Sequence, residues 1–189
     1  MRYIKTEIPE VIILEPKIFE DDRGYFFESF NVKIFEENIG YPVNFCQDNE
    51  SKSSYGALRG LHYQLPPFSQ SKLVRVIKGS VLDVAVDIRK NSSTFGKYVA
   101  VELNSKNKRQ LFIPRGFAHG FVTLSESAIF AYKVDNYYSP EFDRGIVFND
   151  NTLNIDWKVM VDDILLSAKD EKHPEFKNAE IFECEFHYN

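Results

Sequence analysis

Short apolar runs, separated by turn-forming Gly, Pro, Asn, Asp and Ser, recur along most of this chain. The turn signals return about every 8–12 residues, which is the spacing of an all-β sandwich or barrel. Aromatic residues make up 15% of the sequence, and their rings pack well on a pleated surface. We therefore predict an all-β fold with strands at residues 11–14, 25–30, 43–49, 73–77, 81–87, 98–103, 110–113, 120–124 and 128–134.

The segments between these runs predict the connections. Lys78-Gly79-Ser80 separates two apolar runs and predicts a hairpin. Residues 32–38 predict a short helix that ends at Gly40. From about residue 150 the runs give way to loops and short helical turns. We therefore expect one domain over residues 1–189 with a C-terminal extension.

Composition argues against several classes of protein. The net charge is −5 and no basic block is present, so binding to nucleic acid has no electrostatic support. No run approaches the roughly 20 apolar residues of a membrane span, and the charged N-terminus lacks the apolar run of a signal peptide. Cys46 and Cys184 match neither a zinc motif nor a disulfide scaffold. We expect a cytoplasmic protein that binds neither nucleic acid nor membrane.

Residues 57–64, together with Lys72, carry the first chemical signal. Arg59 is a fork of donors suited to phosphate, His62 exchanges a proton near neutral pH, and Lys72 meets negative charge on oxygen. This group predicts an anionic substrate and a proton-transfer reaction. The alternative is a surface strand with ordinary charged neighbours. The loop at residues 66–71 is expected to hold Lys72 opposite His62 across neighbouring strands.

Residues 114–119 have the form P-x-G-x-x-H and resemble the second motif of the cupins, which are double-sheet jelly rolls. In metal-binding cupins the first motif supplies two histidines and a glutamate. This chain has Gln64 at the second histidine position and Lys72 near the carboxylate position. A lysine there repels a cation, and zinc catalysis normally takes three protein ligands. We expect no metal, and a metal-dependent cupin enzyme is the alternative.

A longer ordered set of motifs extends from about residue 8 to residue 182. It comprises residues 22–28, 47–51, 56–64, 112–121, 138–140, 144–146, 149–150 and 165–170. The set resembles the dTDP-4-dehydrorhamnose 3,5-epimerase family. The resemblance implies a homodimer of cupin-type jelly rolls (double-stranded β-helices). It also implies a cofactor-independent isomerase that acts on a dTDP-4-keto-6-deoxy-hexose at C3 and C5.

The resemblance also implies roles for four catalytic residues. His62 would be the base, and Asp170 its dyad partner. Lys72 would lie near O4, where the enolate charge develops, and Tyr132 would be the acid on the opposite face of the sugar. On a strand, Tyr132 shares one face with Phe130, while residues 129, 131 and 133 share the other.

The substrate-binding residues carry over from the same motifs. Candidates for the diphosphate and nearby sugar oxygens, through charge-assisted hydrogen bonds, are Arg23, Arg59 and Lys169. Candidates for contacts with the nucleoside or the sugar are Phe26, Glu28, Gln47, Asn49, His119, Tyr138 and Asp143. Asp143 stands where the family often has Glu. Arg115 stands where an acidic residue is common, and we expect it on the surface.

Other interpretations stay open at this point. One alternative is a mono-epimerase that inverts only C3 or C5, and another is an epimerase of a different nucleotide-linked 4-keto sugar. A third is a non-catalytic cupin sugar-binding module. Taken singly, Arg23 fits a solvated turn and Tyr132 fits a core position. Asp83 and Asp87 share a strand face, where a buried carboxylate needs a partner. His173 and His187 lie in polar sequence and are expected to be exposed.

Overall fold

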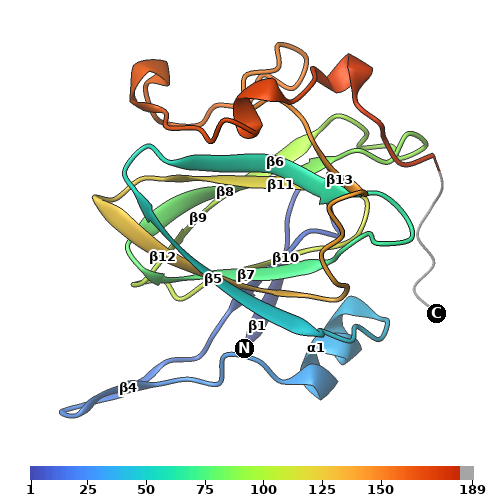
Figure 1. Ribbon diagram of the computed structural model, residues 1–189. Coiled ribbons are helices and arrows are strands. Elements are labelled where there is room, and N and C mark those ends of the chain that lie inside the picture. Colours follow the sequence, from blue (N-terminus) through green and yellow to red (C-terminus); the bar gives the residue numbers. More distant parts are fainter. Residues whose placement is uncertain (184–189) are drawn as a thin grey trace.

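Two antiparallel sheets face each other in the computed structural model, which describes residues 1–183 (Figure 1). The six-stranded sheet has the order β1 (Arg2–Lys5), β2 (Ile12–Glu15), β10 (Gln110–Ile113), β7 (Lys72–Lys78), β12 (Ser127–Val134), β5 (Gln47–Ser54). The five-stranded sheet has the order β13 (Asp143–Gly145), β6 (Leu58–Gln64), β11 (Phe117–Thr123), β8 (Ser80–Asp87), β9 (Tyr98–Asn104). A separate hairpin consists of β3 (Phe19–Asp21) and β4 (Gly24–Phe26). The prediction of an all-β fold is confirmed.

The chain changes sheet at most connections from β5 to β13, and the β8–β9 hairpin is the exception. The hairpin predicted at residues 78–80 is therefore wrong. Strand β7 pairs with β10 and β12, whereas β8 pairs with β9 and β11. Gly79, with a φ of 81°, turns the chain from one sheet to the other. The repeated crossing makes the fold a jelly roll, as expected.

Two strands differ most from their predicted bounds. The strand expected at 43–49 begins at Gln47 and continues to Ser54, and the strand expected at 25–30 ends at Phe26. The sequence of β5, QDNESKSS, is polar throughout, and its residues alternate between an exposed face and a more buried face. A strand that is polar on both faces has no apolar period, so the sequence pattern missed its second half.

Side chains pack in three layers. Between the sheets lie aromatic and branched residues such as Val74, Phe121 and Phe130. The C-terminal segment covers the outer face of the five-stranded sheet, with Trp157 and Phe176 buried beneath it (Figure 1). This segment contains three 3₁₀ turns, η1 (Val161–Asp163), η2 (Asp170–Lys172) and η3 (Phe176–Asn178), which agree with the expected short helical turns.

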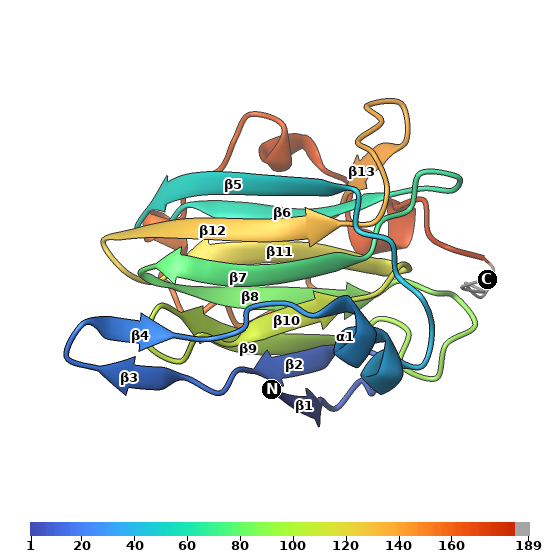
Figure 2. The same ribbon diagram turned by 90° about the horizontal axis from the view of Figure 1, so that it is seen from below.

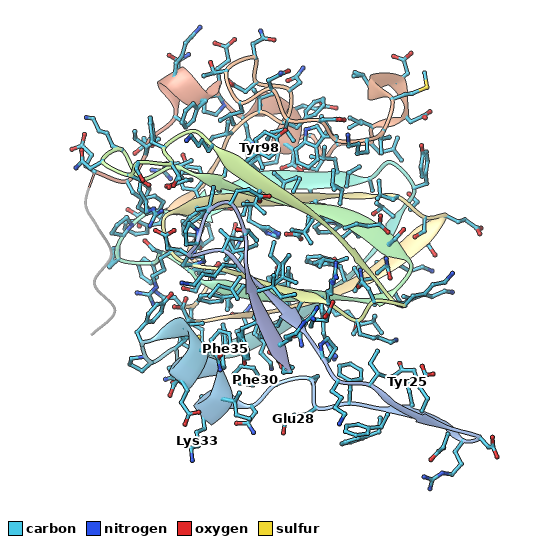
Figure 3. All side chains as sticks on the ribbon, turned by 180° about the vertical axis from the view of Figure 1, so that it is seen from behind. Tyr25, Glu28, Phe30, Lys33, Phe35 and Tyr98 are labelled. Atoms are coloured by element: carbon cyan, nitrogen blue, oxygen red, sulfur yellow. The ribbon has the colours of Figure 1, made fainter. Side chains whose placement is uncertain are left out.

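Helix α1 (Val32–Ile39) covers the six-stranded sheet from its outer side. Phe35 contacts Phe112 edge to face, with 5.0 Å between ring centroids, while Lys33 points away from the sheet (Figure 3). Asn31 accepts a hydrogen bond at the N-terminus of the helix, and Gly40 ends it with a φ of 89°, as predicted. Within residues 1–183, no helix has the length and apolar character needed to cross a membrane.

Strands β6 and β11 approach each other closely at two glycines. A β-carbon on Gly60 would lie 2.5 Å from the Cα atom of Gly120 and 2.8 Å from the carbonyl oxygen of His119. The ladder between the two strands shifts register at this point. Beyond the shift, both Arg59 and His62 line the space between the sheets, although they are three residues apart. The glycine contact therefore helps to place His62.

We expect Gly60→Ala to destabilise the protein by about 3 kcal/mol or more. Its φ of 129° strains an alanine by roughly 1–2 kcal/mol, and the close contact adds roughly 1–3 kcal/mol of overpacking. Gly24→Ala is the matched control, since its φ is 128° and its β-carbon would meet no atom within 4 Å. Denaturant unfolding of both variants measures the difference. Equal losses of stability would show that the approach of β6 and β11 tolerates a side chain.

Candidate active site

A cavity of about 620 Å³ opens between the two sheets and beneath the C-terminal segment. Strands β5, β6, β7, β11 and β12 line it, together with residues 165–170. More than half of the predicted site residues contribute to its wall: Asn49, Arg59, His62, Lys72, His119, Tyr132, Lys169 and Asp170. Positions far apart in the sequence therefore meet at one place.

A short hydrogen bond at the cavity joins His62 and Asp170, with 2.6 Å between His62 Nε2 and Asp170 Oδ1. The Asp170 side chain is only 5% exposed. Burial alone would raise the pKa of Asp170, but its hydrogen bonds to His62 and Ser167 outweigh that effect and lower the pKa. Asp170 is therefore an anion at neutral pH. Because Nε2 of His62 is engaged, Nδ1 is the nitrogen that remains to accept a proton from a substrate.

Lys72 and Tyr132 reach the cavity from the opposite sheet. The loop at 66–71 carries the chain from β6 in one sheet to β7 in the other. The expectation that Lys72 and His62 face each other across neighbouring strands is therefore wrong, because they contribute from the two facing sheets. Tyr132 packs against Phe130 on the inner face of β12, whereas Lys133 bonds to Asp48 on the outer face, as the alternation predicted.

Burial tunes the pKa of both groups from this sheet. It lowers the pKa of Lys72 to about 8, against the opposing charges of Asp143 and Asp83. It raises the pKa of the Tyr132 hydroxyl above 10, although the charge of Arg59 acts in the opposite direction. Tyr132 thus holds its proton at neutral pH, and Lys72 is a cation that loses its proton far more readily than a lysine in water.

A second histidine–carboxylate pair supports the floor of the cavity. His119 Nε2 lies 2.9 Å from Oδ2 of Asp83, whose side chain is fully buried. Burial lowers the pKa of His119. His119 is paired with His62 across the β6–β11 ladder, so the two imidazoles come from adjacent strands. Asp83, to which the sequence analysis gave no role, is thus the partner of His119. A carboxylate at a buried position of an otherwise apolar strand was the sequence signal that could have identified this pair.

Tyr138, Asp143 and Lys169 form a cluster at the edge of the cavity. The Tyr138 hydroxyl donates to Asp143 at 2.8 Å, and the Lys169 ammonium also donates to Asp143. Of the three, Lys169 lines the cavity itself. Next to them, the amide of Gln64 accepts from the backbone N–H of Ser139 at 2.6 Å and donates to two loop carbonyls. Gln64 therefore holds the loops together, and both its amide oxygen and its amide nitrogen are engaged in these hydrogen bonds.

The remaining predicted binding residues do not line the cavity. Arg23 and Phe26 lie on the β3–β4 hairpin, which projects beyond the body of the protein (Figures 1 and 2). Arg23 is paired with Asp21 and its side chain is 90% exposed. Glu28 is exposed in the segment between β4 and α1 (Figure 3). Gln47 donates to Asn49 at 2.8 Å and so lies beside the cavity wall.

The expected exposure of His173 is wrong. The side chain of His173 is only 8% exposed, because the C-terminal segment folds back onto β13 and β6 and covers it. Arg115 lies partly exposed at the surface, with 30% of its side chain accessible, and bonds to the buried Asp135 at 3.0 Å. His187 lies outside the described residues.

His62, Asp170 and His173 are, within residues 1–183, the group of three side chains whose metal-binding atoms lie within 4.8 Å of one another. The bond between His62 and Asp170 already engages two of these atoms. The arrangement serves a general base: a carboxylate orients an imidazole and stabilises its charged form. A hydroxyl and an ammonium group face the pair across the cavity, which suits proton transfer to a substrate that develops negative charge on oxygen.

Known proteins are similar to this chain over most of its length. The sequence model of the dTDP-4-dehydrorhamnose 3,5-epimerase family matches residues 5–178. A dTDP-4-dehydrorhamnose 3,5-epimerase from Shigella flexneri is 58% identical over 96% of this chain and 99% of its own length.

Solved structures agree in fold. An epimerase from Legionella pneumophila, crystallised in complex with dTDP-4-keto-L-rhamnose, has a TM-score of 0.94 and 47% identity over 98% of this chain and 99% of that one. A 3'-monoepimerase from Streptomyces bikiniensis in complex with dTDP-quinovose has a TM-score of 0.84 and 32% identity, and covers 92% of this chain and 87% of that one. The chain belongs to the dTDP-4-dehydrorhamnose 3,5-epimerase family.

Proposed function

We propose that this protein is an isomerase that inverts C3 and C5 of dTDP-4-dehydro-6-deoxy-D-glucose, giving dTDP-4-dehydro-L-rhamnose. One observation carries the proposal beyond family membership. The His62–Asp170 pair lies on one side of the cavity, and Tyr132 reaches the same cavity from the facing sheet. An epimerase needs a base and an acid on opposite faces of a sugar ring, and the two sheets supply them.

The proposed reaction proceeds by two proton transfers at each carbon. The C4 ketone makes the protons on C3 and C5 acidic. Nδ1 of His62 removes one of them, and the imidazolium is stabilised by Asp170. The electron pair moves to O4, where the charged Lys72 stabilises the enolate. Tyr132 then donates its proton to the opposite face of the carbon. Before the second carbon reacts, the imidazolium of His62 gives its proton to solvent and the phenolate of Tyr132 takes one from solvent. The ketone itself accepts the electron pair, so no step requires a cofactor.

Charge at the edge of the cavity suits the nucleoside diphosphate. Nε of Arg59 donates to Ser53 at 3.0 Å, which holds the guanidinium fork at the cavity wall. Lys169 is paired with Asp143, and a diphosphate would replace that partner. Tyr138, which is 56% exposed beside this cluster, offers a ring for the nucleoside base. Because nucleotide sugars are cytoplasmic metabolites, we also infer a cytoplasmic location.

We further propose a homodimer in which each β3–β4 hairpin completes the site of the other subunit. Arg23 and Phe26 match binding motifs of the family but lie away from the cavity of their own chain. Phe19, Tyr25 and Phe26 on the hairpin are each more than half exposed. An apolar hairpin that projects into solvent suits burial against a partner. The symmetry of a dimer would bring two hairpins to two cavities.

Deuterium exchange tests the proposed reaction. Incubated with the dTDP-4-keto-6-deoxy sugar in D₂O and a chelator, the protein is expected to introduce deuterium at both C3 and C5, which NMR measures. His62→Ala is expected to lose exchange by about 10²-fold or more. Tyr132→Phe is expected to retain proton removal and to lose inversion, while Tyr137→Phe, whose side chain is exposed on a loop, serves as its control.

The label also separates the alternatives. Deuterium at one carbon alone would identify a mono-epimerase, such as the Streptomyces bikiniensis protein. Exchange that the chelator abolishes would identify a metal enzyme, and binding without exchange would identify a sugar-binding module. Each of these results contradicts the proposal.

The pH dependence of kcat/KM tests the role of Lys72. Its pKa of about 8 in the free protein means that the cation is lost as the pH rises through that value. Since the enolate needs the cation, we expect kcat/KM to fall tenfold per pH unit above about 8. Lys72→Met is expected to lose about 10²–10³-fold in kcat. A profile that stays flat to pH 10 would contradict this role.

Mixed dimers test the shared site. His62→Ala chains and Arg23→Ala chains are each expected to be nearly inactive on their own. Co-expressed in equal amounts, they are expected to recover about a quarter of wild-type activity, because half of the dimers are mixed and each mixed dimer holds one intact site. Recovery is absent if the hairpin serves its own subunit or if the protein is a monomer.

A further inference from the structure

His173 is a buried histidine without a hydrogen bond. Both ring nitrogens are inaccessible to solvent, and neither has a partner within residues 1–183. Buried polar groups in native proteins are nearly always bonded, and an unsatisfied group is costly. Such exceptions gather at functional sites. The lack of a hydrogen bond at His173, which lies beside the catalytic pair, therefore needs a physical explanation.

The ring lies directly against the His62–Asp170 pair. Its plane is perpendicular to the imidazole of His62, with 5.4 Å between centroids. Its Nδ1 is 3.9 Å from Oδ1 of Asp170, the oxygen that bonds to His62, and this distance is too long for a hydrogen bond. His173 thus occupies the space beside Asp170 without bonding to it.

The ring of His173 fits against strand β13 because residue 145 is a glycine. Gly145 in β13 is paired with His62 in β6, and a β-carbon at Gly145 would overlap the ring edge that carries both nitrogens of His173. The glycine, the histidine and the dyad therefore form one packed unit. A side chain at 145 would displace His173 from Asp170.

The charges around His173 favour its neutral form. Burial lowers its pKa, and a positive charge on His62 adds to this effect. Asp170 and Asp143 act in the opposite direction, and Lys169 reinforces the lowering. A neutral ring does not compete as a cation for Asp170.

We propose that His173 is a positioning residue that fills the space beside the His62–Asp170 pair, keeps water and competing donors from that side of Asp170, and so reserves the carboxylate for His62. The proposal rests on the proposed function only in naming His62 as the base. A donor beside Asp170 would draw off part of its negative charge, which weakens its hold on the imidazolium of His62. His62 would then be a weaker base.

Two substitutions of equal shape test this role. His173→Leu puts only methyl groups beside Asp170. The side chain of His173→Asn is smaller than the imidazole ring and is not held by packing at 3.9 Å, so we expect its amide to move toward Asp170 and donate to it. The pKa of His62 is measured by NMR titration of its imidazole signals, assigned with His62→Asn. Turnover is measured with the dTDP-4-keto-6-deoxy sugar.

We expect His173→Leu to keep the pKa of His62 within a few tenths of a unit and kcat within about threefold. We expect His173→Asn to lower that pKa by about one unit and kcat by about tenfold, since one unit equals a tenfold weaker interaction. KM should change less than kcat in both variants. The proposal would be overturned if the two variants had the same His62 pKa and the same kcat. It would also be overturned if His173→Leu lowered the His62 pKa and kcat as much as is expected for His173→Asn. Failure of the wild-type protein to exchange deuterium would refute the proposed function. The titration would still test the role of His173, because it measures the His62–Asp170 pair directly.

Discussion

The hydrogen bond between His62 and Asp170 joins the two parts of the protein on which the site depends. His62 belongs to a strand of the five-stranded sheet, and Asp170 begins a 3₁₀ turn in the segment that covers that sheet. Because Asp170 is buried and ionised, the bond selects Nδ1 of His62 as the free basic atom. The C-terminal segment is thus part of the catalytic structure. It packs on the five-stranded sheet through Trp157 and Phe176, which anchors the segment that carries the carboxylate.

The jelly roll supplies a property that a single sheet lacks. Its chain crosses from sheet to sheet, so residues close in sequence, such as His62 and Lys72, come to lie on facing walls of one cavity. A sugar ring held between the walls can meet a base on one face and an acid on the other. The cost is a polar interior at this end of the sandwich, where Lys72, Asp83 and His119 replace apolar core.

The sequence pattern predicted the all-β class because most strands carry a buried apolar face. It could not say which sheet receives the next strand, since residues 78–80 look like any tight turn, and the hairpin predicted there was wrong. It missed half of β5, whose polar residues line the cavity and the surface. The resemblance to the family named eight residues that line the cavity, whereas Arg23, Phe26 and Glu28, which it also named, lie outside it. His173 escaped both approaches, because its polar neighbours suggested solvent and only the fold brings Gly145 against its ring.

The central claim is that acid and base approach the sugar from facing sheets. A crystal structure of the His62→Asn protein with the dTDP-4-keto-6-deoxy sugar bound tests this most directly. We predict that the hexose ring lies in the cavity with position 62 and the Tyr132 hydroxyl on opposite faces, and with O4 about 3 Å from the Lys72 ammonium. A ring that meets position 62 and Tyr132 on the same face, or that binds outside the cavity, would contradict the account.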